Sequence, residues 1–243
     1  MSEKSTPRLF VDSALGGEVS VSGPQAHYLL HVMRRKPGDA VLLFNGRDGE
    51  WLYAVETASR RDVLLMPRER TRDQAVPVDL ELLFAPLKKA RTDYAAQKAT
   101  ELGVSRLTPV ITARTIAERV KTDRLHANAV EAAEQCGLLW VPEVSDPVTL
   151  GDALAAWPAG RTLIFCDETE AAASPLEALR ALGEGPKTVL IGPEGGFTPQ
   201  EAAAIRALDS AVAISLGPRI MRADTAAVAA LTLVQAAAGD WRG

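Results

Sequence analysis

Cysteine is scarce in this 243-residue chain, and no apolar run is long enough for a membrane span. The two cysteines, Cys136 and Cys166, are too few for a metal cluster or a disulfide framework, so we expect both to be reduced packing residues. The longest uncharged apolar segment, from Thr225 to Gly239, has 15 residues, whereas a spanning helix needs about 20. The opening residues MSEKSTPRLF are polar where a secretory leader needs an apolar block. We therefore expect a cytoplasmic protein without membrane attachment.

A large excess of positive charge is also missing, because the formal net charge is -4. This excludes a protein that coats nucleic acid through bulk charge. Residues 1 to 75 hold 11 Lys and Arg against 10 Asp and Glu, and residues 76 to 243 hold 16 against 21. Aromatic residues make up only 5% of the chain, so stacking on bases cannot provide most of the affinity for a nucleic acid. We expect a nearly neutral N-terminal part with local basic clusters and an acidic C-terminal part.

Metal-binding patterns are equally sparse. His27 and His31 have the i, i+4 spacing of a helical metal pair, but no HExxH motif and no obvious third ligand accompanies them. His126 belongs to no signature. We expect no metal.

Hydrophobic residues make up 47% of the chain, and the pattern of apolar runs differs between its N-terminal and C-terminal parts. Short apolar runs with turn signals and one helix over 23–35 predict a small antiparallel barrel or curled sheet. The segment 66–79, MPRERTRDQAVPVD, has two prolines and alternating charge, which is typical of a linker. With the boundary near Ala75, the expected domains are 1–74 and 75–243. The second domain alternates strands and helices, which predicts an α/β fold with a mostly parallel sheet.

Several helix boundaries are marked in this second part. Thr92 is the expected cap of a helix that Gly103 ends, and Thr198 and Glu201 form a capping box with proline at the first helical position. The expected strands are 78–87, 104–112, 161–168, 187–192 and 211–217. The expected helices are 92–103, 122–137, 174–182, one after Thr198, and 225–239.

The stretch TVLIGPEGGFTPQE, residues 188–201, has the strand, glycine turn and helix start of a nucleotide-binding loop. It lacks the P-loop and G-x-G-x-x-G spacings, and no lysine or arginine lies between Lys187 and Arg206. Glu194 in the turn would repel a phosphate. One alternative is a plain turn in which glycines relieve backbone strain. The other is a site for an uncharged adenosine or a cationic ligand.

A second motif, SLGPRIMRADTAAVAAL, covers residues 215–231. A strand ends there in a Leu-Gly-Pro bend, and Arg219 and Arg222 follow, three residues apart, before a helix of small residues. Two precise loops and an intervening pair of arginines favour catalysis over simple binding.

Together these stretches resemble the ribosomal small-subunit RNA uridine-N3 methyltransferases of the knotted SPOUT superfamily. RTDYAAQKATELGV and EAAEQCG upstream agree with it, and HYLLHVMRRKPGD looks like the family's HHLxxVLRxKxGD signature in its PUA-like β-barrel. The resemblance covers nearly the whole chain. It implies a C-terminal SPOUT domain with a deep trefoil knot, an exception to the rule against threaded chains. It also implies S-adenosylmethionine as cofactor, ribosomal RNA or the small ribosomal subunit as partner, and a homodimer.

The resemblance implies that the loops after LIFC, LIG and ISLG wrap the adenosine, with main-chain groups at the adenine edge. The expected cofactor-binding residues are Leu190, Ile191, Gly192, Pro193, Glu194, Gly195, Gly196, Ser215, Leu216, Gly217, Ile220, Met221, Thr225 and Ala226.

Methylation at uridine N3 requires loss of the N3 proton and stabilisation of the resulting anion. Arg222 is the leading candidate for that stabilisation, with Arg219 next, although both could instead pair with carboxylates across an interface. Glu194 and Asp224 are the available proton acceptors. The family usually has glutamate in place of Asp224 and often arginine in place of Leu138, so the roles of these two positions are in question.

Basic clusters supply candidate phosphate contacts, although many such clusters are simply charged surfaces exposed to solvent that bind no ligand. The expected RNA-binding residues are Arg34, Arg35, Lys36, Arg60, Arg61, Lys88, Lys89, Arg91 and Lys98, with Arg68, Arg70 and Arg72 near the linker.

The expected function is S-adenosylmethionine-dependent methylation of N3 of a specific uridine in 16S ribosomal RNA. Three alternatives stay open: a non-catalytic RNA-binding ribosome assembly factor, a methyltransferase acting on transfer RNA, and a nucleotide-dependent metabolic enzyme on an open α/β sheet.

Overall fold

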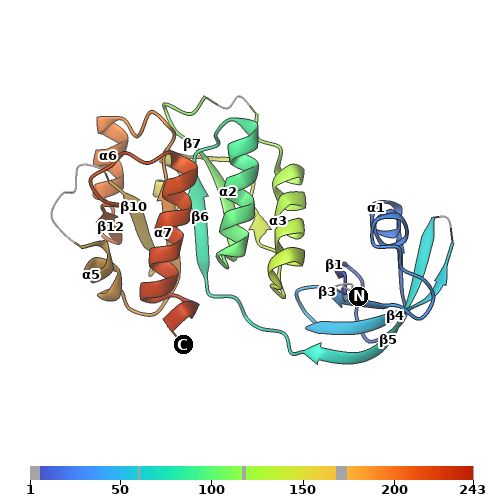
Figure 1. Cartoon of the computed structure of the whole chain (residues 1–243). Helices are drawn as coiled ribbons and strands as arrows, with labels where there is room; N and C mark the ends of the chain where they lie inside the picture. The colour runs from blue at the N-terminus through green and yellow to red at the C-terminus, as the bar shows by residue number, and fades with distance from the viewer. Residues whose placement is uncertain (1–5, 60, 117–118, 168–173, 243) are drawn as a thin grey trace. The chain divides into compact units, whose positions relative to one another are not determined.

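The computed structural model describes residues 6–59, 61–116, 119–167 and 174–242 (Figure 1). The chain forms two compact units, residues 1–76 with 133–140, and residues 77–132 with 141–243. Residues 133–140 join the first unit through hydrogen bonds. The Arg8 guanidinium donates to the carbonyl oxygen of Ala133 at 2.6 Å and to that of Leu138.

The first unit is a five-stranded sheet with strand order β1-β3-β4-β5-β2. Its strands are β1 (Arg8–Phe10), β2 (Val19–Ser22), β3 (Ala40–Phe44), β4 (Glu50–Ala58) and β5 (Asp62–Arg72). All pairs are antiparallel except β1 with β3. Three register shifts between β4 and β5 bend this long hairpin, which confirms the curled antiparallel sheet. Alternate residues of β2 are buried, as expected for a sheet with one solvated face.

The predicted linker 66–79 is wrong over its first half, because β5 continues to Arg72. Pro67 fits within this strand because it lies opposite Tyr53, beyond the stretch of β5 that pairs with β2. Proline is tolerated at such an edge, where no ladder hydrogen bond is lost. The alternating charges of this segment are the exposed residues of an edge strand.

The predicted helix 23–35 is shorter than expected. It consists of α1 (Gly23–His27) and a π-helical turn, η1 (Tyr28–Val32). Arg34 adopts a φ of 52°, which ends the helix, and the backbone N–H of Arg35 bonds back to Leu29.

The second unit is a seven-stranded parallel sheet in the order β12-β10-β11-β6-β7-β8, with β9 also on β7. The strands are β6 (Leu80–Phe84), β7 (Arg106–Ile111), β8 (Glu143–Val144), β9 (Val148–Thr149), β10 (Thr162–Cys166), β11 (Lys187–Ile191) and β12 (Ala211–Ile214). Every residue of β11 is buried, as a central parallel strand requires. The predicted α/β fold is confirmed.

Helices cover both faces of this sheet. One core contains residues of α2 (Lys89–Glu101), α3 (Thr122–Cys136), α5 (Pro175–Arg180) and α7 (Ala223–Ala238). The core on the other face contains residues of α4 (Leu150–Ala155) and α6 (Pro199–Arg206). Figure 1 shows α2, α3 and α7 side by side over the strands, and a short 3-10 turn, η2 (Asp240–Arg242), follows α7. None of the helices in the described ranges has the length and hydropathy of a bilayer span.

Most predicted boundaries in this unit hold. Gly103 and Gly137 follow the ends of α2 and α3 with φ values of 78° and 80°. The capping box of Thr198 and Glu201 is formed in full. The expected cap at Thr92 is wrong, because α2 begins one turn earlier and the Thr92 hydroxyl bonds to Leu87 instead. The sequence did not predict α4, β8 or β9.

Candidate functional site

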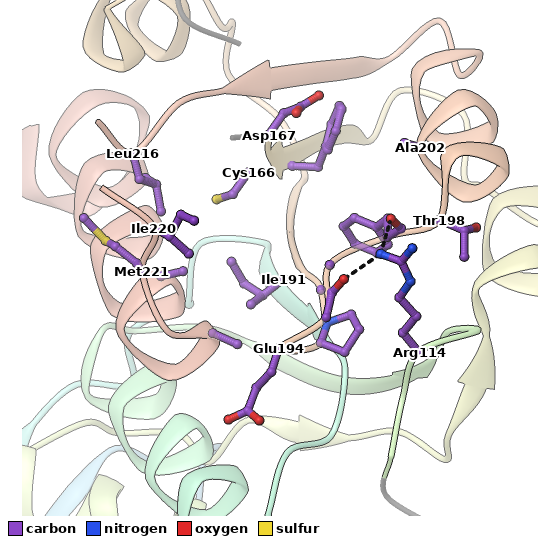
Figure 2. A pocket seen from close by; sticks show the side chains of 18 of the residues that line it. Arg114, Cys166, Asp167, Ile191, Glu194, Thr198, Ala202, Leu216, Ile220 and Met221 are labelled. Carbon is purple, nitrogen blue, oxygen red and sulfur yellow. Dashed lines mark hydrogen bonds between the residues drawn. The ribbon is translucent and has the colours of Figure 1, made fainter. Parts of the chain in front are cut away.

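A cavity of about 650 Å³ lies at the carboxyl ends of β10, β11 and β12. Its walls come from the segments that follow these three strands, from the first turn of α7, and from Arg114 after β7. Ligands of parallel α/β sheets bind at this edge because the loops that leave neighbouring strands converge there. In Figure 2, Leu216, Ile220 and Met221 face the glycine-rich loop from one side, and Arg114 and Thr198 face it from the other.

Most of the predicted cofactor-binding residues line this cavity. They are Ile191, Gly192, Pro193, Glu194, Gly195, Gly196, Leu216, Gly217, Ile220, Met221 and Ala226. Three others lie outside the wall. Leu190 is fully buried in β11, Thr225 is exposed on α7, and the Ser215 hydroxyl accepts a hydrogen bond from the Gly217 N–H at 3.3 Å. The loop after β10 continues from Asp167 into residues 168–173, which lie outside the described residues.

Glycine is needed in the cavity wall for conformational reasons. Gly196 and Gly217 have φ values of +67° and +101°, and a Cβ atom at either position would enter open space. At Gly192 a Cβ atom would approach the Phe197 ring to 3.0 Å, so this loop folds tightly against its own aromatic side chain. The result is a surface of bare main chain facing the cavity.

Arg114, in the turn after β7, holds this loop in place. One of its Nη atoms donates to the carbonyl oxygens of Gly195 at 2.7 Å and Phe197 at 3.2 Å (Figure 2). The Glu201 carboxylate makes a parallel link, accepting from the N–H groups of Ala113 at 2.7 Å and Thr198 at 2.8 Å. Burial raises the pKa of Glu201, but these hydrogen bonds outweigh it and hold the pKa below its ordinary value. Arg114 has no sequence signature and was missed.

The end of β10 contributes an ion pair and a thiol. Asp167 is buried and pairs with Arg206 of α6, and both line the cavity. Cys166 also lines it, and burial raises the pKa of its thiol to about 12. The sequence analysis missed Asp167 and Arg206, although Asp167 directly follows a buried strand, which is the signal that finds such residues.

The two predicted proton acceptors are brought together by Arg91. Its guanidinium forms an ion pair with Glu194 of the glycine-rich loop, and its Nε atom lies 3.7 Å from the Asp224 carboxylate at the start of α7. Arg91 was expected to bind RNA, and its described partners are these two carboxylates.

The two predicted catalytic arginines differ in position. Arg219 lines the cavity, whereas Arg222 precedes α7 as its N-cap residue and does not line it. Both side chains are exposed, and neither has an ion-pair or hydrogen-bond partner among the described residues. The structure therefore leaves both free to meet a ligand.

The other predicted RNA-binding residues are spread over both units. Arg34, Lys36, Arg61, Lys88 and Lys89 are exposed. Arg35 is buried, Lys98 pairs with Glu101 at 2.7 Å, and Arg60 lies outside the described residues.

Near the predicted linker, Arg70 pairs with Asp73 and Arg72 with Glu50, while Arg68 is exposed. The rings of His27 and His31 lie 4.8 Å apart between centroids and are tilted by 42°. Over the described ranges, no three potential ligands are grouped around a metal position.

Both the N-terminal and the C-terminal part of the chain resemble domains of known proteins. The sequence profile of an RNA methyltransferase domain matches residues 74–235, and that of an RNA methyltransferase PUA domain matches residues 21–65. The ribosomal RNA small subunit methyltransferase E of Rickettsia conorii is 30% identical over 94% of either chain. Its namesake from Bacillus subtilis is 27% identical over 88% of either chain.

The crystal structure of the corresponding Neisseria gonorrhoeae enzyme, bound to S-adenosyl methionine, superposes with a TM-score of 0.83. It is 28% identical, and the match covers 95% of this chain and 97% of that one. With a matching family profile over most of its length and relatives of the same architecture, this chain belongs to the RNA methyltransferase family.

Proposed function

We propose that this protein transfers a methyl group from S-adenosylmethionine to N3 of a specific uridine in 16S ribosomal RNA. The observation that carries the proposal is the cavity walled by bare main chain at the ends of β10, β11 and β12. It occurs in a chain whose relatives are named small-subunit ribosomal RNA methyltransferases, one of them bound to S-adenosyl methionine.

The residues of the cavity fit this donor better than a phosphorylated nucleotide. Three arginines line the wall, but Arg206 is paired with Asp167 and Arg114 is bound to loop carbonyls. Glu194 and Asp167 also line the wall, and each is paired with an arginine. A wall whose charges are largely paired suits an uncharged adenosine better than a phosphate chain.

When bound, S-adenosylmethionine supplies a methyl group made electrophilic by its sulfonium. The chain must bring uridine N3 into line with it and remove the N3 proton. The nitrogen lone pair then forms the N–CH3 bond, the C–S bond pair stays on sulfur, and one proton is released. Arg222 and Arg219 would offset the negative charge on the base. Glu194 or Asp224, which both pair with Arg91, would accept the proton.

The partner assignments follow from the same proposal. The exposed basic residues Arg34, Lys36 and Arg61 would contact RNA phosphates.

The protein would act in the cytoplasm as a two-fold homodimer, and its second domain, 75–243, would contain the trefoil knot. Sedimentation should give twice the monomer mass of 25.9 kDa, and a monomer at micromolar concentration would contradict the dimer.

The deciding experiment is mass mapping of ribosomal RNA from a strain that lacks this protein. We expect one methylated uridine of 16S RNA to become unmodified and to be restored by the purified protein with S-adenosylmethionine. If a methyl group were missing from transfer RNA instead, transfer RNA would be the substrate. An intact methylation map together with no S-adenosylmethionine binding by calorimetry would favour an assembly factor.

A further inference from the structure

A second, smaller cavity of about 90 Å³ adjoins the large one. Its apolar walls are Pro86 and Leu87 after β6, Ile116 after β7, and Pro193 at the start of the glycine-rich loop. Lys88, Arg114 and Glu194 complete the lining. No sequence motif predicted it, because its residues come from three loops that are distant in the chain.

The two cavities share part of their walls. Arg114, Pro193 and Glu194 line both, so molecules in the two cavities would contact the same short loop and lie next to each other. We propose, on the basis of the proposed function, that the small cavity receives the target uracil base. The donor then occupies the large cavity, and the reacting atoms meet beside Pro193 and Glu194.

The lining suits a flat pyrimidine. Apolar side chains such as Leu87, Ile116 and Pro193 can cover the faces of a base that has left the RNA stack. Uracil presents an N3–H donor between two carbonyl acceptors. Glu194 can only accept when ionised, and Lys88 and Arg114 can only donate, so the polar groups match this pattern in kind.

The cavity is also reachable by RNA. Ile116 is 78% exposed, and the Lys88 side chain is exposed beside it. The positive charge of Lys88 at the rim is complementary to the phosphate that accompanies an incoming nucleotide. A rival occupant is the amino-acid end of S-adenosylmethionine, whose charges Lys88 and Glu194 could also meet.

Bulky substitutions in the two cavities separate these occupants. Ile116 lines only the small cavity and Ile220 only the large one, and both are largely exposed, so replacement by tryptophan should not disturb folding. For Ile116→Trp we expect methyl transfer to small-subunit RNA to fall at least ~10-fold, with unchanged S-adenosylmethionine affinity by calorimetry. Ile220→Trp should weaken S-adenosylmethionine binding. Val76→Trp, 90% exposed and outside both cavities, is the control.

Wild-type turnover by Ile116→Trp would overturn the assignment, and so would a loss of S-adenosylmethionine affinity in that variant. A wild-type chain that methylates no ribosomal RNA would instead overturn the proposed function and the base site with it. Photo-crosslinking to small-subunit RNA transcribed with 4-thiouridine gives an independent test. We expect crosslinked peptides that contain residues 86–88 or 114–116, and crosslinks confined to the N-terminal unit would contradict the proposal.

Discussion

Arg91 lies between two carboxylates that are far apart in the sequence, Glu194 in the glycine-rich loop and Asp224 at the start of α7. The Arg91 side chain is 29% exposed, and the two carboxylates are 39% and 17% exposed. Ion pairs this close to solvent stabilise a fold by roughly 1 kcal/mol or less. The arrangement therefore matters for where the loop and α7 are held rather than for global stability.

Replacement of Arg91 should affect catalysis more than folding. We expect Arg91→Met to reduce methyl transfer at least ~10-fold, because Glu194 and Asp224 lose their common partner, while the melting temperature changes little. Arg106→Met is the matched control, since Arg106 also pairs with a carboxylate, Glu143, and lines neither cavity. Equal activity losses in the two variants would count against a specific role for Arg91.

Arg222 is the residue on which the chemical step should depend most. We expect Arg222→Ala to lower single-turnover methyl transfer by at least ~100-fold, the scale of losing one transition-state donor. Cofactor affinity should persist, because Arg222 does not line the large cavity. Unchanged turnover would remove Arg222 from the mechanism. Arg219→Ala, at a position that does line the cavity, should reduce both cofactor affinity and rate.

The start of α6 links the glycine-rich loop to the turn after β7. Thr198 and Glu201 satisfy each other's backbone N–H groups, and Glu201 also accepts from Ala113. A capping box of this kind satisfies donors that the first helical turn leaves open. In this protein the same carboxylate also fixes one wall of the cavity.

The lowered pKa of Glu201 makes a pH-dependent contribution to stability. Above the ordinary value of 4.5 the carboxylate stabilises the fold, and this contribution is lost as the pH falls through the lowered pKa. Urea unfolding should therefore show Glu201→Gln less stable than wild type at pH 7, with the difference shrinking in acid. Glu177→Gln, in the first turn of α5, is the control. A difference that stays constant with pH would contradict this account.

Local sequence signals predicted most of the helices and strands of the α/β unit. Apolar runs located the five long parallel strands. Gly103 and Gly137 located the ends of two helices, and the capping box at Thr198 located the start of a third. The strand segments that were missed have a common cause in non-local pairing. The end of β5 is a strand because β4 lies beside it, and the two-residue strands β8 and β9 exist only through β7.

Across the whole molecule, the sequence predicted which loops would meet but not which distant side chains would join them. The family resemblance implied that the segments around Gly192 and Gly217 meet, and the parallel strands account for this because their carboxyl ends lie at one edge of the sheet. Arg114 arrives from the turn after β7 through the sheet order, which no spacing encodes, and Arg206 reaches the cavity from the end of α6. The knot also stays a prediction, since hydrophobic periodicity carries no information about threading.

The distribution of charge predicts how RNA binding should depend on salt. The net charge of -4 means that affinity must come from local clusters such as the exposed Arg34 and Lys36. If each meets one phosphate, Arg34→Glu with Lys36→Glu should flatten the slope of log affinity against log salt by roughly 1.4 to 1.8. Lys121→Glu with Arg180→Glu changes the net charge equally and should leave the slope unchanged. Filter binding over a salt series distinguishes the two pairs.

The Cys166 thiol in the cavity wall raises the question of whether the methyl donor could alkylate the protein itself. A methyl donor strong enough to alkylate a uracil would also alkylate a thiolate beside it, since thiolates are far better nucleophiles than thiols. With its pKa raised to about 12, Cys166 keeps its proton at physiological pH. The protonated Cys166 is therefore expected to be a poor nucleophile toward the methyl donor in this cavity.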